Sequence, residues 1–340
     1  MKVLVTGATG FIGRHLVEAL LAKNCTVACT CRKTSNTKHL ELLSCGGNLQ
    51  IVNYDLGGGA FDDASTLHLI DALRDVDYVY HLAGLVKAYS AEEYDRANFL
   101  GTKSLLEAVV KSNNKNLKRF LYLSSLAATG PAEDINGVDE ESQCRPVSLY
   151  GASKLKGEII ANQYKHRIPI TIVRPPPVYG PGDAGLFFFF SSLAKGIKPQ
   201  FTHRKYASLI YVDDLVNAIL VAAESDKAVG QTYFAADREP YSVNRIVDII
   251  GKAMNGRSNP VRVRLGDRLI SGLAGLYEGF CKVIGEPASI INNQKAIELK
   301  QIYWICRTDK IKMDLGFETS VPILEGMEKT ARWYIDNRWI

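Results

Sequence analysis

Tyr150 and Lys154 are the residues of this sequence whose types and spacing point most directly to chemistry. They lie four positions apart within a helix expected over residues 149–164, so they would share one face of it. A phenol with an ordinary pKa of about 10 is a poor base at neutral pH, but an adjacent ammonium lowers that pKa. The pair could therefore exchange a proton with a substrate hydroxyl, while Ser124 or Ser125 binds the reacting oxygen.

A Tyr-x-x-x-Lys spacing also occurs by chance on surface helices, so its meaning depends on the elements around it. The chain begins with an apolar strand, 3–5, followed by Gly7, Gly10 and Gly13 and then by apolar residues at helical spacing over 16–21. Gly7 would allow a sharp turn, Gly10 would let a pyrophosphate approach the backbone, and Gly13 would let the helix pack closely on the strand. The N–H groups at the helix start would bind phosphate, which predicts a dinucleotide site.

Strands and helices alternate through the first half of the chain. The expected strands are 26–30, 50–54, 78–82, 120–123 and 171–173, and the main helices are 92–111 and 149–164. This alternation predicts an α/β fold with a doubly wound parallel sheet and right-handed crossovers. Ligands bind such sheets at the carboxyl ends of the strands, so the glycine turn, Ala83-Gly84, Ser124-Ser125 and Arg174-Pro175 should line one cleft.

The pattern changes after Pro175, where three consecutive prolines exclude regular structure. We expect 1–175 and 207–237 to form the dinucleotide-binding domain. Residues 176–206 and 238–320 should form a smaller, mostly helical substrate lobe, and 321–340 a C-terminal helix.

The composition is that of a globular enzyme-sized chain. It has 340 residues, 46% of them hydrophobic, and a net charge of +5 without a Lys/Arg block that would suggest a nucleic-acid groove. We expect no membrane span, because no apolar run approaches about 20 residues, and no signal peptide, because residue 1 leads directly into a strand. The seven cysteines form no CxxC pair, so we expect free thiols and a cytoplasmic location. No histidine shows metal-ligand spacing with a partner, so we expect no metal.

Together these features resemble the extended form of the short-chain dehydrogenase/reductase superfamily, over nearly the whole chain. The matching motifs are 6–13, Asp55-Leu56, His81-Leu-Ala-Gly84, Asn98-Phe-Leu-Gly-Thr102, Ser124-Ser125, Tyr150 with Lys154, and 174–181. The family's catalytic serine lies 25 residues before the tyrosine in the sugar epimerases used for comparison, which selects Ser125. The resemblance implies that Tyr150 is the general acid/base and that Lys154 tunes it and binds the nicotinamide ribose. It also implies a small-molecule substrate and a homodimer formed through the helices that contain Asn98 and Tyr150.

The resemblance also implies which residues bind the cofactor and the substrate. The cofactor residues would be Gly7, Thr9, Gly10, Phe11, Ile12, Gly13, Arg32, Asp55, Leu56, Ala83, Gly84, Tyr150, Lys154, Pro175 and Val178. The substrate residues would be Lys87, Asn98, Ser125 and Phe187. An acid at the end of strand two would select NAD, but the family pattern places Cys31 there, followed by Arg32. Arg32 could hold a 2′-phosphate by bidentate bonding, which favours NADP(H), or merely stack on adenine, which leaves NAD(H) open.

The branch of the family is indicated by two departures from its sugar-binding members. Sugar epimerases usually carry an Arg-Asp pair where this chain has Ala207-Ser208, and dehydratases an acidic pair where it has Leu126-Ala127. We therefore expect an NAD(P)-dependent oxidoreductase for an apolar alcohol or ketone, similar to dihydroflavonol reductases and 3β-hydroxysteroid dehydrogenases. The alternatives are a nucleotide-sugar epimerase with tightly bound NAD and a non-catalytic nucleotide-binding relative.

Two apolar segments bear on the substrate class. The aromatics 187–190 cannot all face one side of a helix, because successive side chains are about 100° apart; some should enter the core, and others could face the cleft or a partner. Apolar residues recur at roughly helical spacing over 269–283, at Leu269, Ile270, Leu273, Leu276, Phe280 and Val283. That stretch could be an ordinary core helix, form an apolar lid or lie on a membrane surface.

Overall fold

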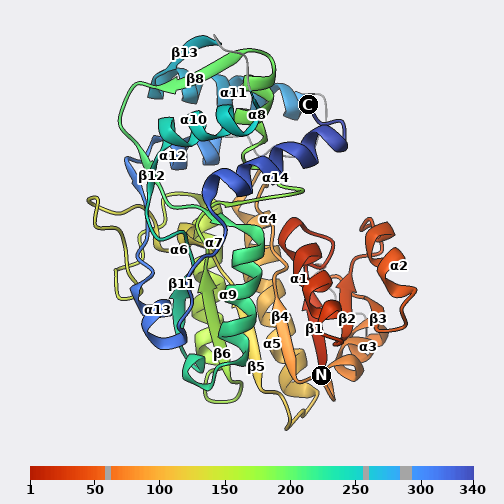
Figure 1. The fold of residues 1–340 in the computed structure, drawn as a ribbon. Helices are drawn as coiled ribbons and strands as arrows, with labels where there is room; N and C mark the ends of the chain where they lie inside the picture. Colours follow the sequence, from red (N-terminus) through yellow and green to blue (C-terminus); the bar gives the residue numbers. More distant parts are fainter. Residues whose placement is uncertain (58–62, 256–259, 284–292) are drawn as a thin grey trace.

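A seven-stranded, fully parallel sheet forms the centre of the protein (Figure 1). This computed structural model describes residues 1–57, 63–255, 260–283 and 293–340. The sheet has the order β11-β6-β5-β4-β1-β2-β3. Its strands are β1 (Lys2–Thr6), β2 (Thr26–Cys31), β3 (Leu49–Asn53), β4 (Tyr78–His81), β5 (Arg119–Leu123), β6 (Ile170–Arg174) and β11 (Thr232–Phe234). Because β1 lies between β2 and β4, the strand order reverses there, and doubly wound sheets bind ligands at such a switch point.

Helices cover both faces of the sheet, and the alternation of side chains along each strand divides the core in two. Val3 and Val5 of β1 pack with α1 (Phe11–Ala22), α2 (Lys38–Ser44) and α9 (Val212–Glu224). Leu4 points to the opposite face and packs with α3 (Asp63–Leu73), α5 (Gly101–Lys111) and α7 (Leu149–Gln163). The predicted α/β doubly wound sheet is therefore confirmed, with both faces buried as parallel strands require.

The helix predicted over 92–111 is interrupted by a short π-helix. It consists of α4 (Ala91–Asp95), the π-turn η1 (Arg96–Leu100) and α5. The wider turn contains Asn98, whose side chain is bonded to Leu85 and Ser153 outside the helix. Such π-bulges often accompany functional positions, and the hydrophobic periodicity on which the prediction rested does not reveal them.

Most of the later elements form a smaller lobe above the carboxyl edge of the sheet (Figure 1). They are α8 (Phe187–Ala194), β8 (Ile197–Phe201), α10 (Val243–Ala253), β13 (Val261–Leu265), α11 (Asp267–Val283), α12 (Asn293–Lys300) and α14 (Ile323–Asp336). Next to this lobe is a three-stranded sheet of β12 (Tyr241–Ser242), β9 (Tyr206–Ala207) and β14 (Tyr303–Trp304). The α14 helix shares one core with α8 and α10. The exact domain boundaries stay a prediction.

The aromatic run 187–190 distributes as helical geometry requires. Phe189 and Phe190 are buried in the core of the small lobe, whereas Phe188 is 41% exposed. The side chain of Phe187 is partly buried and contacts Tyr334. None of the helices in the described parts of the chain has the length and apolar character needed to cross a bilayer.

A buried ion pair holds α7 on the sheet. Arg174 at the end of β6 donates from Nε and Nη2 to both carboxylate oxygens of Glu158, at 2.9 and 2.6 Å. Both side chains are at most 7% exposed. A bidentate bond in this setting satisfies two charges that burial would otherwise strongly disfavour.

We expect Glu158→Ala to destabilise the protein by about 3–5 kcal/mol, because it leaves a buried guanidinium unpaired. The matched control is Glu318→Ala, which breaks an exposed ion pair with Lys312 and should cost about 1 kcal/mol or less. Urea-induced unfolding followed by circular dichroism measures both. Equal losses in the two variants would contradict this account of the Arg174–Glu158 pair.

Candidate active site

The glycine loop between β1 and α1 lies at the carboxyl edge of the sheet. Gly7 has a φ of +74°, and a Cβ there would lie 2.7 Å from the backbone nitrogen of Ala83. A Cβ at Gly13 would lie 2.1 Å from Gly7 O, so α1 can pack on the loop only without side chains at these positions. Gly10 is the N-cap of α1 and supplies no side-chain cap. The N–H groups of the first turn are therefore suited to bind a phosphate.

The side chains between the glycines contact both the small lobe and the sheet. Thr9 O accepts a hydrogen bond from Arg14 Nε (3.1 Å). Phe11 packs against the core of the small lobe, whereas Ile12 packs against the sheet. The loop is thus held from both sides.

A series of hydrogen bonds fixes the end of β4. Ala83 N–H donates to Thr6 Oγ1 (3.1 Å), which lies 2.7 Å from His81 Nδ1. His81 Nε2 lies 2.9 Å from Thr102 Oγ1, which donates to Asn98 O (2.7 Å). Burial lowers the pKa of His81 to about 3, so the ring is neutral at pH 7. Both ring nitrogens are occupied, and His81 therefore serves to position the strand end.

Asn98 is fully buried, and its side chain makes three hydrogen bonds within the protein. Its Nδ2 donates to Leu85 O (3.0 Å) and Ser153 Oγ (2.8 Å), and its Oδ1 accepts from Leu85 N–H (2.7 Å). These bonds fix the segment after β4 against α7, and a contact of Asn98 with substrate stays a prediction.

Ser125 and Tyr150 are brought together at the end of β5. Ser125 Oγ accepts from Ala127 N–H (3.1 Å) as the N-cap of α6 (Leu126–Thr129), and the nearby Ser125 hydroxyl lowers the pKa of the Tyr150 phenol. Ser124, in contrast, is buried, and its Oγ has no hydrogen-bond partner among the described residues. Of the two serines, Ser125 is thus the one that faces the tyrosine.

Lys154 lies one turn after Tyr150 and is 3% exposed. Its Nζ donates to Leu123 O (2.7 Å) and lies 4.4 Å from the centroid of the Tyr122 ring. Burial lowers the pKa of Lys154 to about 7, although the charge of Glu158 raises it. The ammonium therefore lies under the end of β5, with its proton poised to leave near neutral pH.

One electrostatic expectation is corrected. Burial raises the pKa of Tyr150, Ser125 lowers it, and the charge of Glu298 raises it. Lys154 was expected to lower this pKa, but its amine bonds Leu123 O and is itself easily neutralised. In the protein without cofactor, Tyr150 is consequently a protonated phenol.

The remaining cofactor residues lie after the ends of successive strands. Arg32 is exposed directly after β2, and Asp55 and Leu56 follow β3 closely. Asp55 Oδ1 accepts from Gly57 N–H (3.1 Å). Pro175 follows β6, and Val178 belongs to β7 (Val178–Tyr179), which pairs with β10 (Ile210–Tyr211). The predicted set is therefore distributed along one edge of the sheet.

The predicted substrate residues are spread over several segments. Lys87 is exposed after β4, as is Gly84 of the predicted cofactor set. The ring of Phe187 packs at 5.4 Å from that of Tyr334 and 5.3 Å from that of Trp339. The C-terminal segment thus contacts Phe187, whose part in substrate binding stays a prediction.

The apolar spacing over 269–283 does form a helix, α11. Leu269 is 45% and Leu276 77% exposed, whereas Ile270 packs against the core of the small lobe. Leu273, Phe280 and Val283 lie outside the described side chains. The helix thus has an inner side and an apolar outer stripe.

Sequence reasoning missed the contact of α12 with the start of α7. Ser148 caps α7 by accepting from Gly151 N–H (3.1 Å) and donates to Glu298 Oε1 (2.8 Å). A serine just before a predicted helix is a recognisable N-cap signal. Glu298, however, is 150 positions away, and no local pattern connects the two.

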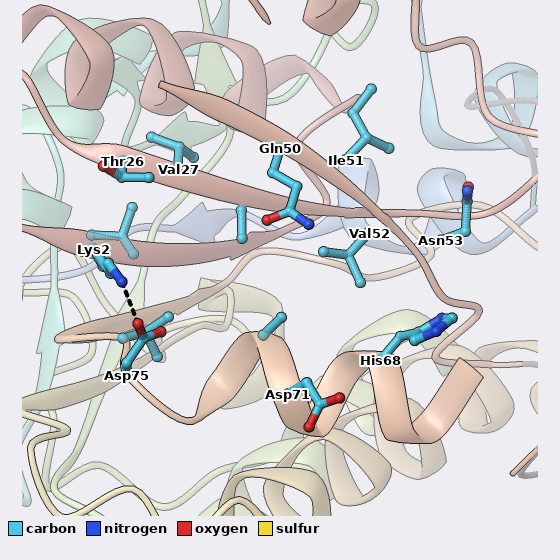
Figure 2. A pocket seen from close by; sticks show the side chains of 14 residues that line it. Lys2, Thr26, Val27, Gln50, Ile51, Val52, Asn53, His68, Asp71 and Asp75 are labelled. Atoms are coloured by element: carbon cyan, nitrogen blue, oxygen red, sulfur yellow. Dashed lines mark hydrogen bonds and ion pairs between the residues drawn. The ribbon is translucent and has the colours of Figure 1, made fainter. Parts of the chain in front are cut away.

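A cavity of about 590 Å³ lies far from these residues (Figure 2). Its lining comes from β1, β2, β3 and α3, including Gln50, Asn53, His68 and Asp71. Lys2 and Asp75 form an ion pair at one end of it. None of the predicted catalytic residues lines this cavity, so the chemistry is assigned to the carboxyl edge of the sheet.

The chain is similar to known proteins over most of its length. The family model described as "NAD dependent epimerase/dehydratase family" matches residues 3–236. A ceramide reductase of Caulobacter vibrioides is 28% identical over 99% of this chain and 96% of its own. A 3β-hydroxysteroid dehydrogenase/isomerase of Mycobacterium tuberculosis is 26% identical over 98% of this chain and 90% of its own.

A solved structure supports the fold. The crystal structure of UDP-glucuronic acid 4-epimerase from Bacillus cereus in complex with NAD has a TM-score of 0.75 at 23% identity, covering 99% of both chains. The family model spans more than half of the sequence, and its motifs lie along one sheet edge. The chain therefore belongs to the NAD-dependent epimerase/dehydratase family, whose members are enzymes of the extended short-chain dehydrogenase/reductase type.

Proposed function

We propose that the protein is an NAD(P)-dependent oxidoreductase that acts on an apolar alcohol or ketone. The observation that carries the proposal is the placement of Ser125 and Tyr150 beside each other at the carboxyl edge of the sheet, where Ser125 lowers the pKa of the phenol. Lys154 is buried one turn further along the same helix. A hydroxyl, a phenol and an amine in this order can bind a carbonyl oxygen and deliver a proton to it.

The glycine loop supports a dinucleotide as the cofactor. The approach of Gly7 to Ala83 leaves no room for a Cβ, and the first turn of α1 carries no acidic residue that would repel phosphate. A bound nicotinamide would supply or accept the hydride. The residues of this chain would bind the phosphates and hold the proton at Tyr150.

NADP(H) is the cofactor that we favour, with NAD(H) as the alternative. Cys31 at the end of β2 is buried and offers no carboxylate to a ribose 2′-hydroxyl. Arg32 is exposed beside it and has no ion pair among the described residues. A free guanidinium at this position suits a 2′-phosphate.

The protonation states suit Tyr150 as a general acid. Its pKa is raised by burial, so the phenol carries a proton in the resting protein. After proton transfer to a substrate oxygen, a phenolate would remain. Lys154, on the same helix face, would stabilise that phenolate when its amine is protonated.

The surroundings of Tyr150 support an apolar substrate. The buried cluster beside it consists of Leu126, Ala127, Val138, Phe234, Ala236, Trp304 and Cys306, with Val147 and Ala207 packed against it. Ala207 thus contributes a methyl group where sugar epimerases usually carry a charged residue. The names of two relatives, ceramide reductase and 3β-hydroxysteroid dehydrogenase, also refer to apolar compounds.

A nucleotide sugar, the alternative, would find Arg204 exposed but Lys205 engaged within the protein. Lys205 is 3% exposed, and its Nζ donates to Asp267 Oδ1 (2.7 Å) and Leu299 O (2.8 Å). Ser208, next to Ala207, is buried and accepts from Cys306 N–H (3.2 Å). Neither side chain is available to a diphosphate.

A homodimer is part of the proposal. The helices expected at its interface expose apolar side chains, Leu100 of η1 (47%) and Ile159 of α7 (52%). Burial of such residues against a second copy would remove apolar surface from water.

Substrate class is tested by competition. The protein is offered acetophenone and UDP-glucose at equal concentration, with NADPH and NADH supplied in separate reactions. We expect consumption of reduced cofactor with the ketone only, because the wall beside Tyr150 is apolar. Saturable binding or epimerisation of UDP-glucose, with no turnover of ketones, would instead establish the sugar alternative.

Tyr150→Phe should lower turnover by about 10²–10⁴-fold, because the proton donor is lost, and leave cofactor affinity nearly unchanged. The control is Tyr164→Phe at the C-terminal end of the same helix, which should keep its turnover. Steady-state kinetics and titration of cofactor fluorescence give the two quantities. Wild-type turnover in Tyr150→Phe would refute the assignment of the acid/base.

Arg32→Ala should weaken NADP binding by about 10–100-fold, the effect of one or two charge-assisted bonds, and leave NAD binding unchanged. Lys23→Ala, an exposed cation at the far end of α1, controls for net charge. Calorimetric dissociation constants for both cofactors decide the matter. Tighter binding of NAD than NADP by the wild type would reverse the preference.

A further inference from the structure

The helix that carries Tyr150 begins against a helix from the small lobe. Leu149 N–H donates to Gln294 Oε1, and Ser148 Oγ donates to Glu298 Oε1, both at 2.8 Å. Gln294 and Glu298 are four positions apart on α12, so they share one face. Because Ser148 is the N-cap of α7, α12 binds the groups that order the first turn of that helix.

Glu298 is set deeply in this contact. It is 9% exposed, and its second oxygen accepts from Lys295 Nζ (2.9 Å). A carboxylate at the start of a helix interacts favourably with its unpaired N–H groups. Here that carboxylate belongs to another helix, so the order of the first turn of α7 depends on where α12 lies.

The small lobe holds α12 in place from its other end. Lys205 Nζ, just before β9, donates to Leu299 O in the last turn of α12 and to Asp267 Oδ1 at the start of α11. The α12 helix is therefore tied both to the small lobe and to the helix of the proposed proton donor. A displacement of the small lobe would therefore also displace the start of α7.

We propose that Glu298 is a positioning residue: through Ser148 it fixes the first turn of α7 and thereby the place of Tyr150. The inference rests on the proposed function for the role of Tyr150, but the contact of α12 with α7 does not. It assigns to the small lobe a part in preparing the proton donor as well as in binding substrate.

The groups around Tyr150 define what Glu298 contributes. Lys154 lies on the same helix with its amine bonded to Leu123 O, and the Tyr94 ring on α4 lies 6.2 Å from the Tyr150 ring. Ser125, which carries no charge, lowers the pKa of the Tyr150 phenol. Of the charges that act on the phenol, that of Glu298 raises its pKa, after the larger effect of burial.

Three variants separate position from charge. Glu298→Gln keeps an oxygen for Ser148 but removes the charge, Glu298→Ala removes both, and Gln294→Ala removes only the bond to Leu149. The full-length protein is studied in two ways: amide hydrogen exchange over 148–152 without any ligand, and the pH dependence of acetophenone reduction with saturating NADPH.

Turnover is the second readout. At each pH, Glu298→Ala should lower acetophenone reduction, because the turn that carries Tyr150 loses its order, whereas Glu298→Gln keeps an oxygen for Ser148 and should largely restore it. Equal losses in Glu298→Ala and Glu298→Gln, or none in Glu298→Ala, overturn this role.

Positioning is tested by exchange. Glu298→Ala should speed exchange of the first amides of α7 by about fivefold or more, as loss of a cap does, whereas Glu298→Gln should largely restore protection. Unchanged exchange in Glu298→Ala overturns the proposal. If the wild type reduces no ketone, the proposed function fails and with it the role in proton transfer, while exchange still decides whether α12 orders α7.

Discussion

The close approach of α7 to the ends of β5 and β6 is the constraint on which the rest of the site depends. A Cβ at Gly151 would lie 2.2 Å from Ala127 O, and one at Gly157 would lie 2.2 Å from Tyr122 Oη. These two glycines thus let the helix backbone approach α6 at Gly151 and the sheet at Gly157. This approach places Tyr150 beside Ser125 and sends Lys154 beneath the strand ends.

This close packing buries charged side chains, and their charges are stabilised in different ways. Arg174 and Glu158 neutralise one another in a bidentate pair. Lys154 has only a carbonyl and an aromatic face close to its amine, so burial lowers its pKa to about 7. A structural cation and a titratable one therefore lie on the same helix, and the difference between them is the presence of a bonded carboxylate.

The sequence by itself determined the sheet, its helices and the edge at which ligands bind. Those features follow from short-range information: alternation in the strands, 3.6-residue spacing in the helices, and glycines where the backbone turns. The same local signals located Gly7, Tyr150 and Lys154 at the carboxyl edge. They could not locate the π-turn at Asn98, because its side chain is turned by bonds to Leu85 and Ser153, which lie in other segments.

Only the tertiary structure decided which polar groups face one another. It chose Ser125 over Ser124, because one hydroxyl meets Tyr150 and the other is buried without a partner. It also directed Lys154 to Leu123 O, and burial is the main cause of the pKa of the tyrosine. Glu298 meets Ser148 across 150 positions. A hydrogen bond or a pKa depends on distances of a few ångströms, and folding sets such distances between residues whose separation along the chain carries no signal.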